Sequence, residues 1–541
     1  PGTGRVVLAT VLGGALVYWI WLGTVPRSIT TDPAISILAA RGILEHGYPV
    51  LPSGYLYPRA VLPHALVAGS IGLFGLNDFA ITLPAALMSM GSLLLTYLLA
   101  RDALGARWLG IAATLVLVAI QQQAFYATSP RMYMGLQFFT ILAVYSGWKG
   151  WLEDRRGFRW LALFAVVGAM LSHQQGGIVA LMIPLAILAA RALTDGFRGG
   201  VRELPRLAGF AVLLLLWYRF VLRHWFPGTM PQIALRGGTG ARTAGLSLDV
   251  RQWLSHVNWL EHTVPLGLLL LPAVLLLLYG ALSRRSKETS PGVAYLAAVF
   301  GVWALGVLGY VRISGERFWV GIVPVYVLLL LAGTQLLTRR PFSPALSWAP
   351  RGVSTRVAAA VVAAWSVVVI SGASIYYGST GYWDVIKTGY GVPCSRVADD
   401  CWFGKERAFR ELREVLGPED RVVATQPMVA SYYLPRIHGW LVQQSVGDLH
   451  QAFDSPTDEY LGIPLIDTQD ELVALADSPQ RAWVIMDTGA DRWLSEEMTL
   501  LLERSFHLYH RSGHLTVYVS SAEGLPQPGE ASGADAPGNA P

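Results

Sequence analysis

Charged residues are scarce in this sequence. Only 14% of its 541 residues are Asp, Glu, Lys or Arg, against roughly 25% in soluble domains, while 53% are hydrophobic. The formal net charge of +5 comes from short Lys and Arg clusters between apolar runs and not from one basic face, which argues against nucleic acid as a partner. The composition therefore favours a membrane protein.

Cysteine and the common catalytic signatures are also scarce. The only two cysteines, Cys394 and Cys401, lie in a polar segment, where a disulfide between them can persist only in an oxidising compartment. No GxxxxGK[ST], GxSxG or CxxC motif occurs, which argues against ATP-driven transport and serine hydrolysis. Because His224, His256 and His262 lack metal-ligand spacing, no metal site is predicted, although a divalent metal cofactor stays open.

Long apolar runs, in contrast, are abundant. Helices that cross a bilayer need roughly 17 to 25 such residues. About eleven spans are predicted, near residues 6–23, 80–100, 107–122, 133–148, 160–172, 176–191, 206–222, 263–282, 292–311, 318–337 and 356–376. The first run lacks an Ala-x-Ala cleavage site and is followed by many others, so it is interpreted as a retained helix.

The run at residues 60–76 decides the orientation of the later helices. It contains Pro63, His64 and three glycines, which favour an interfacial or shallow re-entrant helix over a span. If it does not span, the Lys and Arg clusters between the later runs face the cytoplasm, as the positive-inside rule requires. We therefore expect a multi-pass protein of the inner or plasma membrane, with residues 24–79 and everything after residue 377 outside the cytoplasm.

The C-terminal part has ordinary charge content and alternates strand and helix patterns. Strand-like runs occur at residues 421–425, 482–487 and 515–520, and the helical run 405–417 ends at a Gly-Pro stop signal. The predicted fold class is an α-helical polytopic membrane protein with a C-terminal soluble α/β domain. The predicted parts are a transmembrane domain (1–378), an extracytoplasmic α/β domain (379–521) and a disordered tail (522–541).

Polar side chains that could carry chemistry gather in the predicted outer loops. Asp32 precedes Pro33 at the start of a predicted helix, so Asp32 is either a helix cap or a catalytic base. His173, at a helix junction, is either a buried hydrogen-bonded residue or a functional one. Four arginines at helix ends either snorkel to lipid headgroups or bind a phosphate or pyrophosphate: Arg59, Arg131, Arg312 and Arg317.

Several segments resemble the integral-membrane glycosyltransferases of the GT-C class, in particular the protein O-mannosyltransferase and aminoarabinose transferase branch (family 39/83 type). The strongest is TTDPAISILAARGILEHGYPV, an outer loop that begins with an acidic residue and continues as a surface helix. ITLPAAL resembles the start of the family's next span. SPRMYM, SHQQGG and ERFWVGIVPVYV resemble three further family segments, so that the resemblance covers roughly residues 1–340.

The resemblance implies a transferase that moves a sugar from a polyprenyl-phosphate donor, held in membrane lipid, to a hydroxyl acceptor on a protein, lipid or glycan. It implies that Asp32 is the general base, that Arg59 holds the carrier phosphate, and that Arg131 and Arg317 neutralise the leaving phosphate. The substrate-binding positions that it implies are Tyr57, His64, Tyr133, His173 and Glu316. A single base acting in one displacement predicts inversion at the anomeric carbon.

Two features depart from the family pattern, and two other functions stay open. Pro33 stands where many relatives have a second acidic residue, and the Lys-Pro-Pro segment of the family is Arg59-Ala60-Val61 here. A transporter or flippase of a lipid-linked substrate would be expected to show inverted repeats and charges near the middle of paired spans, and neither is evident. A noncatalytic scaffold, the third possibility, could lose Asp32 without functional cost.

Overall fold

The chain forms two units. One consists of Pro1–Thr24 with Pro58–Gly378, and the other consists of Val25–Tyr57 with Ser379–Pro541. The loop that follows the first apolar helix thus belongs to the same unit as the C-terminal part. The computed structural model describes residues 2–24, 31–57, 59–222, 291–310, 316–339, 408–442, 457–458, 460–487, 494–511, 515–523 and 525.

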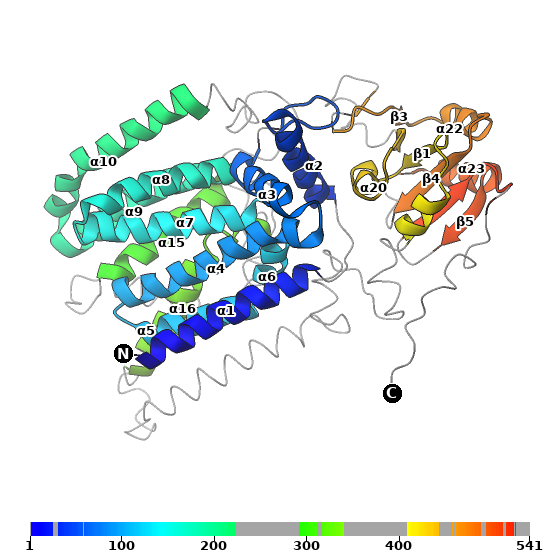
Figure 1. Ribbon diagram of the computed structural model, residues 1–541. Coiled ribbons are helices and arrows are strands. Elements are labelled where there is room, and N and C mark those ends of the chain that lie inside the picture. The colour runs from blue at the N-terminus through cyan, green and yellow to red at the C-terminus, as the bar shows by residue number, and fades with distance from the viewer. Residues whose placement is uncertain are drawn as a thin grey trace, which may run out of the picture. The chain divides into compact units, whose positions relative to one another are not determined.

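The first unit is helical throughout its described part (Figure 1). Its elements are α1 (Gly2–Thr24), α3 (Val61–Phe74), α4 (Asp78–Ala103), α5 (Arg107–Ala119), α6 (Gln121–Thr128), α7 (Tyr133–Gly147), α8 (Arg156–Ser172), α9 (Gly176–Asp195), α10 (Phe197–Trp217), α15 (Pro291–Tyr310) and α16 (Val323–Arg339). Two π turns, η1 (Trp148–Leu152) and η2 (Tyr218–Leu222), extend α7 and α10, and a 3-10 turn, η4 (Glu316–Phe318), comes before α16.

Helices α1, α4, α9 and α15 are long and apolar enough to cross a membrane, which agrees with the predicted membrane protein. The pair α5 and α6, bent by 72°, adds a fifth candidate span. Each predicted span within the described residues coincides with a helix, but the number eleven is not confirmed, because several of these helices are short. The predicted spans at residues 263–282 and 356–376 lie outside the described residues.

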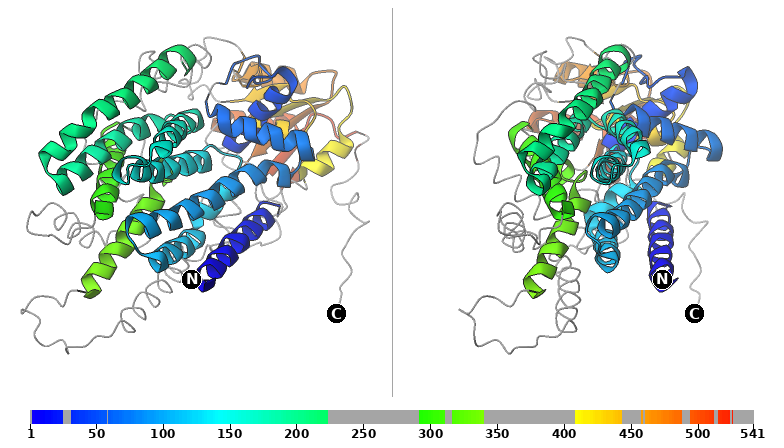
Figure 2. Two further views of the ribbon diagram at one scale, coloured as in Figure 1. Left: turned by 60° about the vertical axis from the view of Figure 1, so that its left-hand side comes forward. Right: turned by 90° about the vertical axis from the view of Figure 1, so that its left-hand side faces the viewer.

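Close packing in the first unit depends on glycines against which aromatic rings pack. Phe138 and Phe139 on α7 pack against Gly91 on α4 and Gly168 on α8, where an added Cβ would collide with their rings. Neighbouring pairs of helices therefore approach closely, as small residues allow in membrane proteins. Figure 2 shows from two further sides that α7, α8, α9 and α15 lie against one another.

The run predicted not to span forms α3, which has 14 residues. At 1.5 Å per residue it is about 21 Å long, less than the roughly 30 Å hydrocarbon core. A helix of this length agrees with the interfacial or re-entrant interpretation. His64 in its first turn is buried, and burial lowers the pKa of His64 to about 4.

The second unit contains α2 (Thr31–His46) and a six-stranded sheet (Figure 1). Its strand order is β3 (Leu465–Ile466), β2 (Gly439–Leu441), β1 (Arg421–Ala424), β4 (Ala482–Asp487), β6 (Leu515–Val519) and β5 (His507–Arg511). The first four strands are parallel, whereas β6 pairs antiparallel with β4 and β5 pairs antiparallel with β6. The other helices are α20 (Pro427–Tyr433), α22 (Gln469–Ala476) and α23 (Glu496–Ser505).

Side chains along the central strands point alternately to the two faces of this sheet, and both faces are buried. Val422 and Ala424 on β1 face one apolar cluster, which includes Phe409 and Leu412 from the helix at residues 408–415. Val423 faces the other cluster, to which α22 and α23 contribute. Such two-sided burial is typical of parallel strands covered by helices, so the described part of this unit is an α/β domain, as predicted.

Candidate active site

The turn between α6 and α7 carries a buried arginine in the first unit. Arg131 is only 4% exposed, and its guanidinium lies over the ring of Tyr133, 4.9 Å from the ring centroid. The Tyr133 ring also packs against Tyr126, with the centroids 4.7 Å apart. Burial of a guanidinium against aromatic faces limits its hydration, which strengthens its attraction for an anion.

His173 occupies the turn between α8 and α9, close to the same tyrosine. Its ring centroid is 5.5 Å from that of Tyr133. The turn is tight because α9 starts at Gly176, where a Cβ would collide with the backbone of Ala169 and Met170. The backbone N–H of Gln175 donates to Nδ1 of His173 at 3.0 Å, which leaves Nε2 to carry the hydrogen of the neutral ring.

Three arginines act on the His173 ring. Burial, followed by the charges of Arg317, Arg131 and Arg59, lowers the pKa of His173 to about 3. The imidazole is therefore neutral at physiological pH and can donate a hydrogen bond from Nε2, but it cannot supply a readily released proton. Three guanidinium charges disfavour a further cation at this place. For the same reason they favour an anion there.

Arg317 lies in η4, a segment that the neighbouring helices hold through its backbone. The carbonyl oxygen of Phe318 accepts hydrogen bonds from Nε2 of Gln175 and from Nε1 of Trp303, both at 3.3 Å. The Arg317 guanidinium lies over the Phe318 ring, 5.1 Å from its centroid. Gln175 thus joins the turn that carries His173 to the turn that carries Arg317.

A buried amide pair, which the sequence analysis missed, supports the two arginine turns. Gln123 on α6 and Gln137 on α7 exchange two hydrogen bonds of 2.9 Å. Gln123 also donates to Oγ of Ser89 at 2.6 Å, and Gln137 donates to the carbonyl of Val320 at 2.9 Å. The sequence signal for this pair was the run of three glutamines at residues 121–123, which begins α6.

The remaining predicted residues are distributed between the two units. Arg59 is exposed in the turn before α3, and Glu316 begins η4. Asp32 and Tyr57 belong to the second unit. Helix α2 begins at Thr31, so the exposed Asp32 lies in its first turn and is not the predicted cap residue. The pair Cys394 and Cys401, together with His224, His256, His262 and Arg312, lies outside the described residues.

No metal-binding cluster accompanies this site. In the described part of the chain, no three His, Cys, Asp or Glu side chains are grouped so that they could hold a metal ion. Asp32 and Glu45 lie thirteen positions apart on α2, about 20 Å along its axis. The carboxylates of α2 therefore do not form a shared cation site.

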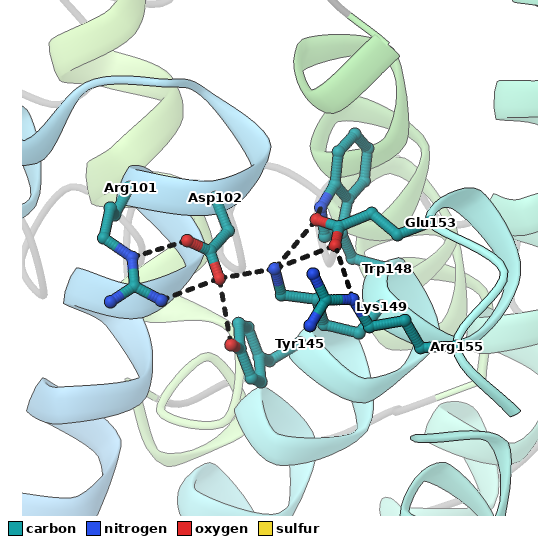
Figure 3. A network of polar contacts seen from close by, with 7 residues as sticks. All are labelled: Arg101, Asp102, Tyr145, Trp148, Lys149, Glu153 and Arg155. Carbon is teal, nitrogen blue, oxygen red and sulfur yellow. Dashed lines mark hydrogen bonds and ion pairs between the residues drawn. The ribbon is translucent and has the colours of Figure 1, made fainter. Parts of the chain in front are cut away.

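A second polar network, also missed from the sequence, lies where α4 meets the π turn after α7 (Figure 3). Nζ of Lys149 contacts Oδ2 of Asp102 at 2.6 Å and Oε1 of Glu153 at 2.8 Å, and Lys149 is buried. Both carboxylates have further partners, since Asp102 binds Arg101 and Tyr145 and Glu153 binds Trp148 and Arg155. Because its members satisfy one another, we interpret this network as structural.

No protein-family model and no curated protein sequence matches the chain. Among solved structures, ArnT from Cupriavidus metallidurans bound to undecaprenyl phosphate is similar over 97% of this chain and 99% of that chain, with 17% identity and a TM-score of 0.58. The apo state of the same ArnT gives 15% identity over 96% and 98% of the two chains, with a TM-score of 0.58. Archaeal oligosaccharyltransferase AglB from Archaeoglobus fulgidus is more distant, with 12% identity over 97% of this chain and 75% of that chain and a TM-score of 0.48. The similarity to ArnT confirms the predicted GT-C glycosyltransferase fold.

Proposed function

We propose that this protein is a membrane glycosyltransferase that moves a sugar from a polyprenyl-phosphate donor to a hydroxyl acceptor on the extracytoplasmic face, with inversion. The observation that carries the proposal is the buried guanidinium of Arg131 over the Tyr133 ring, which packs in turn against the ring of His173. The charges of Arg59, Arg131 and Arg317 all act on that histidine ring. This group joins a concentrated positive charge to hydrogen-bond donors, which suits a lipid-linked phosphate. The ArnT structure of the same fold has undecaprenyl phosphate bound, which supports this class of donor.

The proposed reaction is a single displacement. The Asp32 carboxylate takes the proton of the acceptor hydroxyl while the hydroxyl oxygen attacks the anomeric carbon from the face opposite the phosphate. The bond between the anomeric carbon and the phosphate oxygen breaks, and that oxygen keeps the electron pair. One displacement by one nucleophile inverts the configuration at the anomeric carbon.

The arginines would act on the departing phosphate. Arg131 and Arg317 are the groups proposed to neutralise its growing negative charge, and Arg59 is proposed to hold the carrier phosphate during binding. Nε2–H of His173 would donate to the same group without adding a charge. Tyr57, His64, Tyr133 and Glu316 are proposed to contact the rest of the substrates.

The test measures transfer from a panel of synthetic polyprenyl-phosphate sugars by the purified full chain and by Asp32→Asn. The variant keeps the size and polarity of the side chain but cannot take a proton, so we expect a loss of about a hundredfold or more in turnover. Asp477→Asn is the matched control, because Asp477 is an exposed aspartate at a helix end of the same unit. Full turnover in Asp32→Asn would rule out this base, and no turnover with any donor would favour the transporter.

A further inference from the structure

The second unit contains a cavity of about 730 Å³ that none of the roles above uses. Its lining comes from α2, from the loop that follows α2, and from two C-terminal segments around residues 431–438 and 461–463. The volume lies within the roughly 300–1,000 Å³ of ordinary small-molecule sites. All of its lining residues are described and belong to one unit.

The walls of this cavity are held in place by specific contacts. Gly42 on α2 lies so close to the carbonyl of Val50 that a Cβ at this position would collide with it. The buried Asp458 carboxylate accepts the backbone N–H groups of Tyr460 at 2.7 Å and Leu461 at 3.0 Å, which fixes the loop that supplies Leu461 to the lining. The N–H of Ser53 donates to the carbonyl of Tyr460 at 3.3 Å and ties the two loops together.

Basic side chains outnumber acidic ones in the lining. Arg41 and Arg436 line the cavity, whereas Glu45 is the one carboxylate among its lining residues. Glu45 already contacts Arg41, with N and O 3.6 Å apart, and Arg436 forms no ion pair with any residue that the structure describes. Among the residues that the structure describes, therefore, no carboxylate pairs with Arg436 in this cavity.

The other polar side chains of the lining are those of His46, His438, Tyr48 and Ser431. The backbone N–H of Val422 donates to Nδ1 of His438 at 3.0 Å, so Nε2 carries the hydrogen of the neutral ring and is a donor. Burial, followed by the charges of Arg421 and Arg436, lowers the pKa of His438. The exposed ring of Tyr48 lies 6.3 Å from that of His46, centroid to centroid, and offers a flat surface.

We infer that this cavity binds an acidic saccharide, that is, a sugar unit bearing a carboxylate or a phosphate. Arg436 and Nε2–H of His438 supply donors for the anionic group and a hydroxyl, and Tyr48 supplies an aromatic face for the sugar ring. The apolar side chains of the lining suit the C–H faces of the same ring. This inference rests on the proposed function only in taking that saccharide to be part of the acceptor.

The position of the cavity along α2 adds a length requirement. Asp32 and Arg41 are nine residues apart on this helix, about 14 Å along its axis. An acceptor that places a hydroxyl at Asp32 and an acidic sugar in the cavity must therefore span at least this distance. It must also pass around α2, because nine residues make about two and a half turns and put Asp32 and Arg41 on opposite faces of the helix. The acceptor class is thus an oligosaccharide or a glycan headgroup, because a single sugar is too short.

The test measures saccharide binding to the full chain in lipid nanodiscs without any donor, by saturation-transfer NMR. The probes are glucuronic acid, glucose 6-phosphate, glucose and inorganic phosphate. In Arg436→Gln we expect the Kd of the two acidic sugars to rise about tenfold or more, while weak glucose binding is unchanged. In Tyr48→Ala we expect signals from all three sugars to weaken. Arg504→Gln, which changes an exposed arginine of α23 outside the lining, is the matched control.

The outcomes separate this inference from the proposed function. Unchanged binding of the acidic sugars in Arg436→Gln, an equal loss in Arg504→Gln, or binding of inorganic phosphate without the sugars would overturn the inference. A binding pattern as expected in a protein without transferase activity would keep the cavity assignment and reject the proposed function. Transfer to oligosaccharides without any saccharide binding in this assay would reject the cavity assignment and keep the proposed function.

Discussion

Gln175 donates its backbone N–H to Nδ1 of His173, and the distance between the two nitrogens is 3.0 Å. Because Nδ1 accepts this bond, protonation of the ring would break it and place a positive charge beside three arginines. The side-chain amide of Gln175 donates to Phe318, next to Arg317. Gln175 therefore sets the hydrogen position of the imidazole and also holds the backbone beside Arg317, whose charge acts on that imidazole.

The first prediction concerns the pH dependence of stability. The folded-state pKa of His173, about 3, lies below its ordinary value of 6.5, so the unfolded chain binds the proton first as the pH falls. The contribution of the neutral His173 ring to the free energy of unfolding is complete above pH 6.5, and it is lost progressively between pH 6.5 and pH 3. Between pH 7 and pH 5 the loss amounts to about 2 kcal/mol.

His173→Gln should make the apparent Tm of the protein in nanodiscs depend less on pH over this range. His507→Gln, at an exposed position on β5, is the control and should leave the slope unchanged. Identical slopes for the wild type and His173→Gln would contradict the prediction. Addition of undecaprenyl phosphate should also flatten the wild-type slope, because an anion at the arginines favours the protonated ring.

The second prediction concerns the affinity for the donor phosphate. Arg131→Gln removes a charge-assisted hydrogen bond of about 1.5–3 kcal/mol, so the Kd for undecaprenyl phosphate should rise roughly tenfold to a hundredfold. Arg131→Lys should recover only part of the loss, because an ammonium lacks the paired donors of a guanidinium. A competition assay against a fluorescent polyprenyl phosphate measures the Kd of both variants. Arg107→Gln, at an exposed position on α5, should bind as the wild type does, and a comparable loss there would attribute the effect to charge in general.

The third prediction concerns the network of Figure 3. Lys149→Met removes the cation shared by Asp102 and Glu153, and the loss of one partner from a buried ion network costs on the order of 3 kcal/mol. We expect a lower Tm with unchanged affinity for undecaprenyl phosphate. Arg156→Met, at the exposed start of α8, is the control. A variant as stable as the wild type would mean that the network contributes no net stability.

The fourth prediction concerns the amide pair. Gln137→Leu leaves the buried amide of Gln123 and the carbonyl of Val320 without their partner, at a cost of about 1–3 kcal/mol. The double variant Gln123→Leu with Gln137→Leu should lose less stability than the sum of the two single variants, because fewer polar groups stay unsatisfied. Thermal unfolding of the four proteins measures this coupling. Strict additivity would show that the two amides act independently.

Much of the fold could be predicted because it depends on local pattern. The runs at residues 421–425, 482–487 and 515–520 became β1, β4 and β6, since each of them combines valine with other residues that favour strands. The strands β2 and β3 are only three and two residues long, and β5 has a largely exposed polar sequence, so none of them had a clear signal.

The site could be predicted only in part. Arg131, His173 and Arg317 stood out as polar residues at helix ends, and the structure brings the arginine charges to bear on the histidine ring. The partner of Gln123 could not be predicted, because Gln137 lies on another helix and no spacing rule joins them. The cavity had no sequence signal either, since its two halves lie far apart in the chain.

The grouping of α2 with the C-terminal sheet also determines when this unit can fold. Residues 38–54 are synthesised roughly 380 residues before residues 431–463, with which they share the cavity. At translation rates of about 5–20 residues per second, the earlier segment waits for tens of seconds before its partner exists. During that interval α2 lacks the other half of its unit, which is completed only after the helices of the first unit have been synthesised.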